Sequence, residues 1–103
     1  MAIAVLFELP PGSTVAQYDD AMRVAGDAAL HQPERLYHAC YHTETGFGVF
    51  DIWESEEAFA AFGEVLVPAS EKAGIAPTPH VYPAHQIITQ AGERQLPAPA
   101  EAR

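Results

Sequence analysis

The sequence predicts an α+β domain of the ferredoxin-like type, in which one antiparallel sheet carries two helices on one face. The 103 residues are enough for one hydrophobic core and too few for two. Hydrophobic residues make up 49% of the chain and charged residues 18%, a composition that excludes disorder for most of it. Strand-like runs and helical stripes follow one another in the order βαββαβ, which is the order of that fold.

The first strand and the first helix are predicted before residue 27. Residues 2–8 form a short run rich in β-branched side chains, and both of its alternating sides are apolar. A strand of this kind belongs in the interior of a sheet. Thr14 and Gln17 have the spacing of a capping box, so a helix is predicted from Thr14 to about Ala25, with Gly26 at its end.

A hairpin is predicted next. Residues 27–35 have no clear period and form a connection with at most a short helical turn. Strands at 36–43 and 47–53 follow, and Gly46 between them is expected to supply the positive φ of a tight turn.

The second helix is predicted over residues 56–73, with Ser55 as its cap. Pro68 inside it predicts a kink or a break, because proline removes a backbone hydrogen bond. Residues 80–89 form the last strand, which is expected at an edge of the sheet or with a bulge because Pro83 has no N–H for the ladder.

The chain is therefore divided into a ferredoxin-like domain and a tail. The domain covers residues 1–89. Residues 90–103 are rich in Pro and Ala and are expected to be flexible or to cross to a partner.

The hairpin is expected to gather its polar side chains on one side of the sheet. A two-residue loop that ends at Gly46 pairs His38 with Trp53 and Cys40 with Asp51 across the two strands. The side predicted to face away from the helices carries the polar set, His38, His42, Asp51 and Trp53. The side predicted to pack beneath the second helix carries the aromatic and aliphatic set, Tyr37, Ala39, Tyr41, Phe50 and Ile52.

Six residues are predicted to form a small-molecule site: His38, Asp51 and His85 as the catalytic group, and Trp53, His42 and Tyr82 as the substrate-binding group. An imidazole serves at neutral pH as general base or as hydrogen-bond donor, and a neighbouring carboxylate orients it. A structural role for the histidines is the alternative. The three histidines are also the candidates for a metal site, but no recognised ligand spacing supports one, so no metal is expected.

The charge of the chain excludes several classes of partner. Five basic residues against fourteen acidic ones give a net charge of −9, which repels nucleic acid and anionic membranes. No apolar run reaches the ~20 residues of a spanning helix, and no basic flank marks a signal peptide. The single cysteine, Cys40, is expected to be a buried apolar residue and fits a reducing compartment, so a cytoplasmic location is expected.

One face of the predicted sheet remains without cover. The first strand is apolar on the side away from the helices as well, and burying one large apolar side chain stabilises by about 1.5–3 kcal/mol. A second copy of the chain provides such cover. The sequence therefore predicts a homodimer whose open faces meet.

Several segments resemble a known superfamily. Residues 51–59 contain a W-E-S-E-E-A-F junction between strand and helix, and Pro68 is followed by the segment 73–75, Ala-Gly-Ile. Both are similar to the antibiotic biosynthesis monooxygenases, a superfamily of dimeric α/β barrels. The segments 36–38, Leu-Tyr-His, and 82–85, Tyr-Pro-Ala-His, further resemble a group of small stand-alone members.

The resemblance implies a homodimeric α/β barrel that takes a small-molecule ligand in its cavity. The best-known members oxidise phenolic or quinone-type substrates with O₂ and without metal, flavin or haem, so no cofactor is expected. Their functional set of Asn, Trp and Arg or Tyr is not matched residue by residue, and Trp53 is the candidate for its Trp. The predicted strands contain no basic residue, so the resemblance does not extend to stabilisation of a phenolate by Arg. Two other functions stay open: a non-catalytic dimeric ligand-binding or regulatory module, and a histidine-dependent metal lyase or isomerase.

Overall fold

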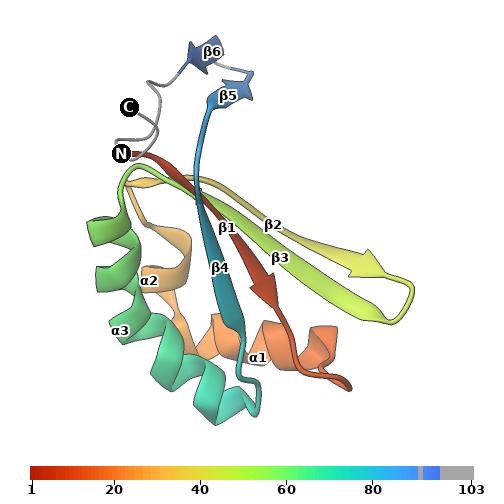
Figure 1. Ribbon diagram of the computed structural model, residues 1–103. Coiled ribbons are helices and arrows are strands. Elements are labelled where there is room, and N and C mark those ends of the chain that lie inside the picture. Colours follow the sequence, from red (N-terminus) through yellow and green to blue (C-terminus); the bar gives the residue numbers. More distant parts are fainter. Residues whose placement is uncertain (91, 96–103) are drawn as a thin grey trace.

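The computed structural model describes residues 1–90 and 92–95 (Figure 1). Its backbone follows the predicted βαββαβ order, with a short extra helix and two extra strands at the end, so the α+β, ferredoxin-like prediction is confirmed. The elements in chain order are β1 (Ile3–Glu8), α1 (Val15–Ala25), α2 (Asp27–Leu30), β2 (Arg35–Thr43), β3 (Gly46–Trp53), α3 (Glu56–Ala73), β4 (Thr78–Pro83), β5 (Gln86–Thr89) and β6 (Gly92–Gln95).

Four strands form one antiparallel sheet in the order β2-β3-β1-β4. β1 lies in the interior, as its two apolar sides predict. β4 lies at an edge, where Pro83 is tolerated without a backbone N–H. Figure 1 shows α1 and α3 on one face of this sheet and no helix on the other.

Local signals determine where the long helices begin. Thr14 Oγ1 accepts the backbone N–H of Gln17 at 3.1 Å, and Gln17 Oε1 accepts the backbone N–H of Thr14 at 2.9 Å. The predicted capping box is therefore confirmed. At the start of α3, Ser55 Oγ accepts the backbone N–H of Ala58 at 3.1 Å.

The helix α3 continues through Pro68 to Ala73, so the break that was one alternative at this proline does not occur. α3 has buried side chains both before Pro68, at Phe62, and after it, at Ala69 and Ser70, and this packing outweighs the one hydrogen bond that proline removes. Gly74 ends the helix in the left-handed conformation, with φ 81°. None of the helices in the described ranges is long and apolar enough to cross a membrane.

The prediction of one last strand over residues 80–89 is wrong. β4 ends at Pro83, and β5 pairs with β6 as a separate antiparallel hairpin that extends beyond the sheet (Figure 1). The chain leaves the sheet where proline cannot continue the ladder. Residues 92–95, which fall in the predicted tail, form β6. Residues 91 and 96–103 lie outside the described residues, and the flexible or partner-crossing tail stays a prediction for them.

The hairpin of β2 and β3 pairs two residues away from the predicted register. Its two-residue loop is 44–45, and Gly46 does not adopt a positive φ. His38 consequently lies opposite Asp51 instead of Trp53. Because side chains alternate with a period of two, a shift of two residues leaves every side chain on the predicted side.

The helices cover the opposite side of the sheet from the one predicted. Ile3, Val5 and Trp53 are buried together with Phe62 of α3, and Asp51 is 2% exposed. The side that the sequence assigns to the helices forms instead an open face, which carries Leu6, Tyr37, Tyr41, Phe50 and Tyr82. The prediction was wrong because the polar side chains on the covered side satisfy one another's hydrogen bonds, which removes the cost of burying them.

Candidate functional site

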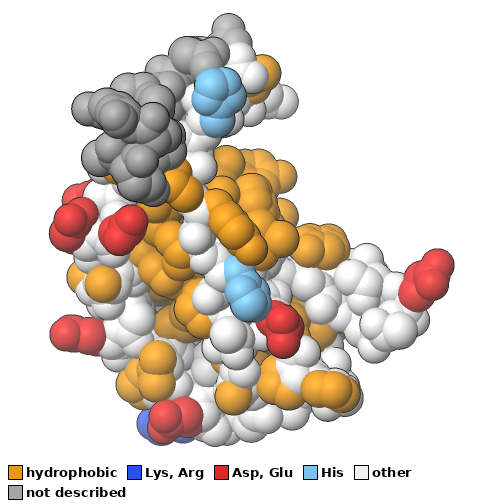
Figure 2. All heavy atoms as spheres, in the orientation of Figure 1, with side chains coloured by type: hydrophobic (Ala, Val, Ile, Leu, Met, Phe, Trp, Pro, Cys, Tyr) orange, Lys and Arg blue, Asp and Glu red, His pale blue; other side chains and the backbone are white. Residues whose placement is uncertain are grey.

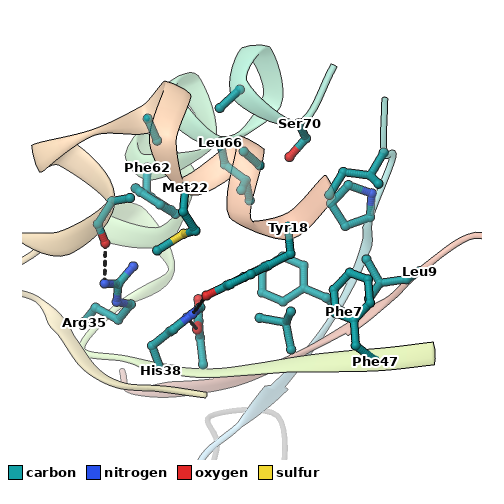
Figure 3. Close-up of a pocket in the computed structure, with 18 residues that line it drawn as sticks. Phe7, Leu9, Tyr18, Met22, Arg35, His38, Phe47, Phe62, Leu66 and Ser70 are labelled. Carbon is teal, nitrogen blue, oxygen red and sulfur yellow. Dashed lines mark hydrogen bonds and ion pairs between the residues drawn. The ribbon is translucent and has the colours of Figure 1, made fainter. Parts of the chain in front are cut away.

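A cavity of about 50 Å³ lies between the sheet and the helices α1 and α3 (Figure 3). Most of its wall is apolar, with Phe7 and Phe47 from the strands, Met22 from α1 and Leu66 from α3. The polar side chains Tyr18, Arg35, His38 and Asp51 gather at one end of it. An apolar wall with a few convergent polar groups is the usual construction of a small-molecule site.

A chain of hydrogen bonds joins the polar side chains at this end. Tyr18 Oη lies 2.6 Å from His38 Nε2, and His38 Nδ1 lies 2.6 Å from Asp51 Oδ1. Trp53 Nε1 donates to Asp51 Oδ2 at 3.0 Å. The buried carboxyl group therefore has a partner on each oxygen, as a group withdrawn from water requires.

The backbone explains why these side chains meet. In the observed register His38 lies directly across the hairpin from Asp51. Trp53 follows Asp51 by two residues on the same strand and therefore on the same side. Tyr18 lies on the stripe of α1 that faces the sheet, and its ring plane is within 12° of the His38 ring plane.

The partners of His38 assign its tautomer. A carboxylate accepts and does not donate, so Nδ1 carries the proton and donates it to Asp51. Nε2 then accepts the Tyr18 hydroxyl. Burial raises the pKa of Tyr18 to about 12, and the nearby Cys40 and Asp51 raise it as well, so the hydroxyl is protonated at neutral pH. We call Tyr18, His38 and Asp51 the relay.

A β-bulge brings a positive charge to the same end of the cavity. The register of β2 shifts between Arg35 and Tyr37, which places Arg35 opposite Trp53 on the covered side. Its guanidinium carbon lies 5.9 Å from the Trp53 ring centroid and 5.7 Å from that of Phe62. The same group donates to the carbonyl oxygen of Ala29. The expectation that the strands contain no basic residue was wrong, because β2 begins earlier than predicted.

The structure brings together three of the six predicted site residues, His38, Asp51 and Trp53. His42 is exposed near the end of the hairpin, Tyr82 is exposed on the open face, and His85 is exposed between β4 and β5. In the part of the chain that the structure describes, no three His, Cys, Asp or Glu residues are placed to hold a metal ion. The convergent group lies beneath the helices and not on the face where the sequence placed it.

Sequence reasoning missed Tyr18 and Arg35. Tyr18 falls on the same helical stripe as Val15, Met22 and Ala25, which by itself indicates packing and not a functional site. A tyrosine on such a stripe needs a partner for its hydroxyl, and this requirement is the signal that points to a histidine on the facing strand. No comparable signal marks Arg35, because a bulge is not visible in the alternation of side chains. Cys40 stands beside this group, and burial raises the pKa of its thiol.

No family model and no curated protein sequence matches the chain. Solved structures match its fold. The cofactor-independent oxygenase SnoaB from Streptomyces nogalater is 14% identical, with a TM-score of 0.56 over 86% of this chain and 96% of its own. A candidate antibiotic biosynthesis monooxygenase from Chloroflexus aurantiacus is 15% identical, with a TM-score of 0.58 over 80% of this chain and 91% of its own. Another from Nitrosomonas europaea is 13% identical, with a TM-score of 0.57 over 82% and 98%. The chain therefore shares its fold with this cofactor-independent oxygenase and these candidate antibiotic biosynthesis monooxygenases.

Proposed function

We propose that the chain is a cytoplasmic, homodimeric enzyme that oxidises a small phenolic molecule with O₂ in the cavity beneath α1 and α3. The observation that carries the proposal is the relay. It joins a hydroxyl on the cavity wall to an accepting ring nitrogen at 2.6 Å, and a buried carboxyl group supports that ring. The fold adds support, because one structure that shares it is a cofactor-independent oxygenase.

The relay removes the phenolic proton of the substrate. The substrate hydroxyl donates to Tyr18 Oη, and as Tyr18 takes this proton it passes its own to His38 Nε2. The substrate becomes a phenolate and His38 an imidazolium, which the hydrogen bond from Nδ1 to Asp51 stabilises. The positive charge of Arg35 favours the phenolate in a site with few other polar groups.

The phenolate is electron-rich enough to react with O₂. For the probe 1-naphthol, one molecule of naphthol and one of O₂ give one molecule of 1,4-naphthoquinone and one of water. The ring C–H opposite the hydroxyl becomes C=O with one oxygen atom of O₂, and the other atom leaves as water. Four electrons pass from the naphthol to O₂, so the step needs no other oxidant or reductant.

The test combines an oxygen electrode with the absorbance of 1,4-naphthoquinone. We expect O₂ uptake to equal quinone formation, and Tyr18→Phe and His38→Ala to lower the rate by about a hundredfold to ten-thousandfold. His31→Ala, at the exposed end of α2, is the matched histidine control and should keep the rate. Binding of 1-naphthol without O₂ uptake would assign the chain to the non-catalytic ligand-binding class instead.

The open face is the proposed dimer contact. Leu6 is 44% exposed, Tyr41 46% and Tyr82 55%. A Cβ on Gly48 would lie 2.5 Å from the Tyr41 ring, so this glycine leaves room for Tyr41 to lie flat on the sheet. In the view of Figure 2 hydrophobic side chains gather over the strands. A large apolar patch on a small protein usually marks an interface, and a second copy covers it most simply.

A further inference from the structure

Ser70 of α3 has a buried hydroxyl without a partner. Ser70 is 3% exposed. Among the described residues, its Oγ is the buried side-chain polar atom that forms no hydrogen bond. A serine in a helix can donate to the carbonyl one turn earlier, and this one does not. An unpaired hydroxyl in a protein interior costs free energy, so this exception points to a partner that binds there.

Ser70 lies on the walls of two neighbouring hollows. The inner one is the cavity of the relay. The outer groove has a volume of about 290 Å³ and runs along α3 beside the start of β4, with Phe59, Gly63, Val67 and Pro79 among its walls. The two hollows share five lining residues, Phe7, Leu66, Ser70, Ile75 and Pro77, so they are direct neighbours. Figure 3 shows Ser70 on the far side of the cavity from His38 and Arg35.

The volumes indicate that the two hollows act together. The inner cavity of about 50 Å³ holds one or two water molecules, far below the roughly 300–1,000 Å³ of small-molecule sites. Joined to the outer groove, it reaches the lower end of that range. A ligand that reaches the relay therefore needs room in the outer groove for the rest of its body.

We propose that the outer groove binds the apolar body of a ligand and that Ser70 forms a hydrogen bond with a carbonyl or hydroxyl oxygen on this body. The shared walls are otherwise apolar, and Phe7 and Phe59 meet edge to face at 6.0 Å to form an aromatic side of the groove. A pure hydrocarbon leaves the Ser70 hydroxyl unpaired, whereas an oxygenated ligand of the same shape pairs it. Ser70 is thus a specificity residue. The inference rests on the proposed function only for the part of the ligand that reaches the relay.

9-Fluorenone and fluorene are the matched probes. They share a rigid three-ring shape, and only fluorenone has an oxygen; neither has a hydroxyl proton for the relay, so binding is measured without turnover. Titration calorimetry, or quenching of the single tryptophan, Trp53, gives the affinities. We expect the unmodified chain to prefer fluorenone. Ser70→Ala should weaken fluorenone binding about five- to tenfold and leave fluorene binding unchanged.

The thermal stability of Ser70→Ala separates ligand recognition from a structural role. The substitution removes an unpaired buried hydroxyl and introduces a better helix former, so Tm should rise. If the Ser70 hydroxyl instead stabilised the fold through a hydrogen bond, Ser70→Ala would lower the Tm. Equal affinity of the unmodified chain for the two probes, or an equal loss of both in Ser70→Ala, overturns the proposal.

A second variant tests the groove independently of Ser70. A Cβ on Gly63 meets nothing within 4 Å, so Gly63→Leu places its side chain in the outer groove and should weaken both probes. Ala61→Leu on the exposed side of α3 is the matched control and should bind both normally. Unchanged binding in Gly63→Leu excludes the groove as the site. Tyr18→Phe should lose naphthol oxidation but keep fluorenone binding. The fluorenone experiment therefore tests the groove whether or not the chain oxidises naphthol.

Discussion

Asp51 shows how one buried side chain positions several others. Its two carboxyl oxygens accept N–H groups from His38 and Trp53, at 2.6 and 3.0 Å. The first bond fixes the tautomer of His38, and the second holds the indole ring in the core. Asp51, which is predicted from the sequence to orient a histidine, therefore determines which nitrogen of His38 can accept a proton.

The substitution Asp51→Asn tests this role because it keeps the shape and replaces an acceptor oxygen with an NH₂ donor. Two N–H groups face the position, so either one of them loses its acceptor or His38 changes tautomer, which turns Nε2 from the acceptor of the Tyr18 hydroxyl into a donor. We expect the free energy of unfolding to fall by about 1–3 kcal/mol in urea denaturation. Glu44→Gln removes the same charge in the exposed hairpin loop and should change it by less than about 0.5 kcal/mol. Equal effects of the two variants would show that the network does not stabilise the fold.

Tyr18 makes the stability of the chain depend on alkaline pH. Its pKa is about 12 in the folded chain and near 10 when unfolded, so the unfolded chain releases this proton first. The stabilisation from Tyr18 is complete below pH 10 and is lost as the pH rises toward 12. Unfolding in urea at pH 9, 10 and 11 should show a smaller decline for Tyr18→Phe than for the unmodified chain. Parallel declines would contradict the raised pKa.

At the scale of helices and strands, the sequence predicts best what depends on a few neighbouring residues. Both helix starts follow from Thr14 and Ser55, because a cap involves residues within one turn. The hairpin register could not be predicted in this way. Two-residue loops at 44–45 and at 45–46 place the same side chains on the same side of the sheet. Packing between the strands decides which of the two loops forms. The bulge that turns Arg35 to the covered side follows from the same long-range packing.

Gly63 and Gly74 differ in backbone conformation, so replacing each with alanine should change stability in opposite directions. Gly63 lies inside the helix with open space around its Cβ position, so Gly63→Ala should stabilise the chain by about 0.5–1 kcal/mol through reduced backbone freedom in the unfolded state. Gly74 has φ 81°, a conformation that strains alanine, so Gly74→Ala should destabilise by about 1 kcal/mol. Thermal unfolding of the two variants measures both shifts, and shifts of the same sign would contradict this account.

At the scale of the whole molecule, the order of the elements was predictable and the covered face of the sheet was not. Hydrophobic periodicity predicts each strand and helix separately, and the order βαββαβ is compatible with few compact topologies. Both sides of β1 and β3 carry large apolar side chains, so the pattern does not say which side the helices cover. Polar side chains on a strand usually mark its solvent side, and this rule predicts the wrong face here. A hydrogen-bond network between Tyr18 on a helix and Asp51 on a strand, 33 positions apart in the sequence, reverses that conclusion.

The open face gives the last prediction, that a charge placed on it separates the two copies. Tyr41→Glu puts an unpaired carboxylate into the proposed contact and should weaken dimerisation about thirtyfold or more, equivalent to about 2 kcal/mol. Val24→Glu is the matched control: Val24 is 48% exposed on α1, against 46% for Tyr41, and lies on the helical layer. Because each copy has a net charge of −9, added salt should tighten the unmodified dimer by screening the repulsion. Native mass spectrometry and light scattering give the oligomeric state, and a monomer at every concentration and salt would mean that the open face binds something other than a second copy.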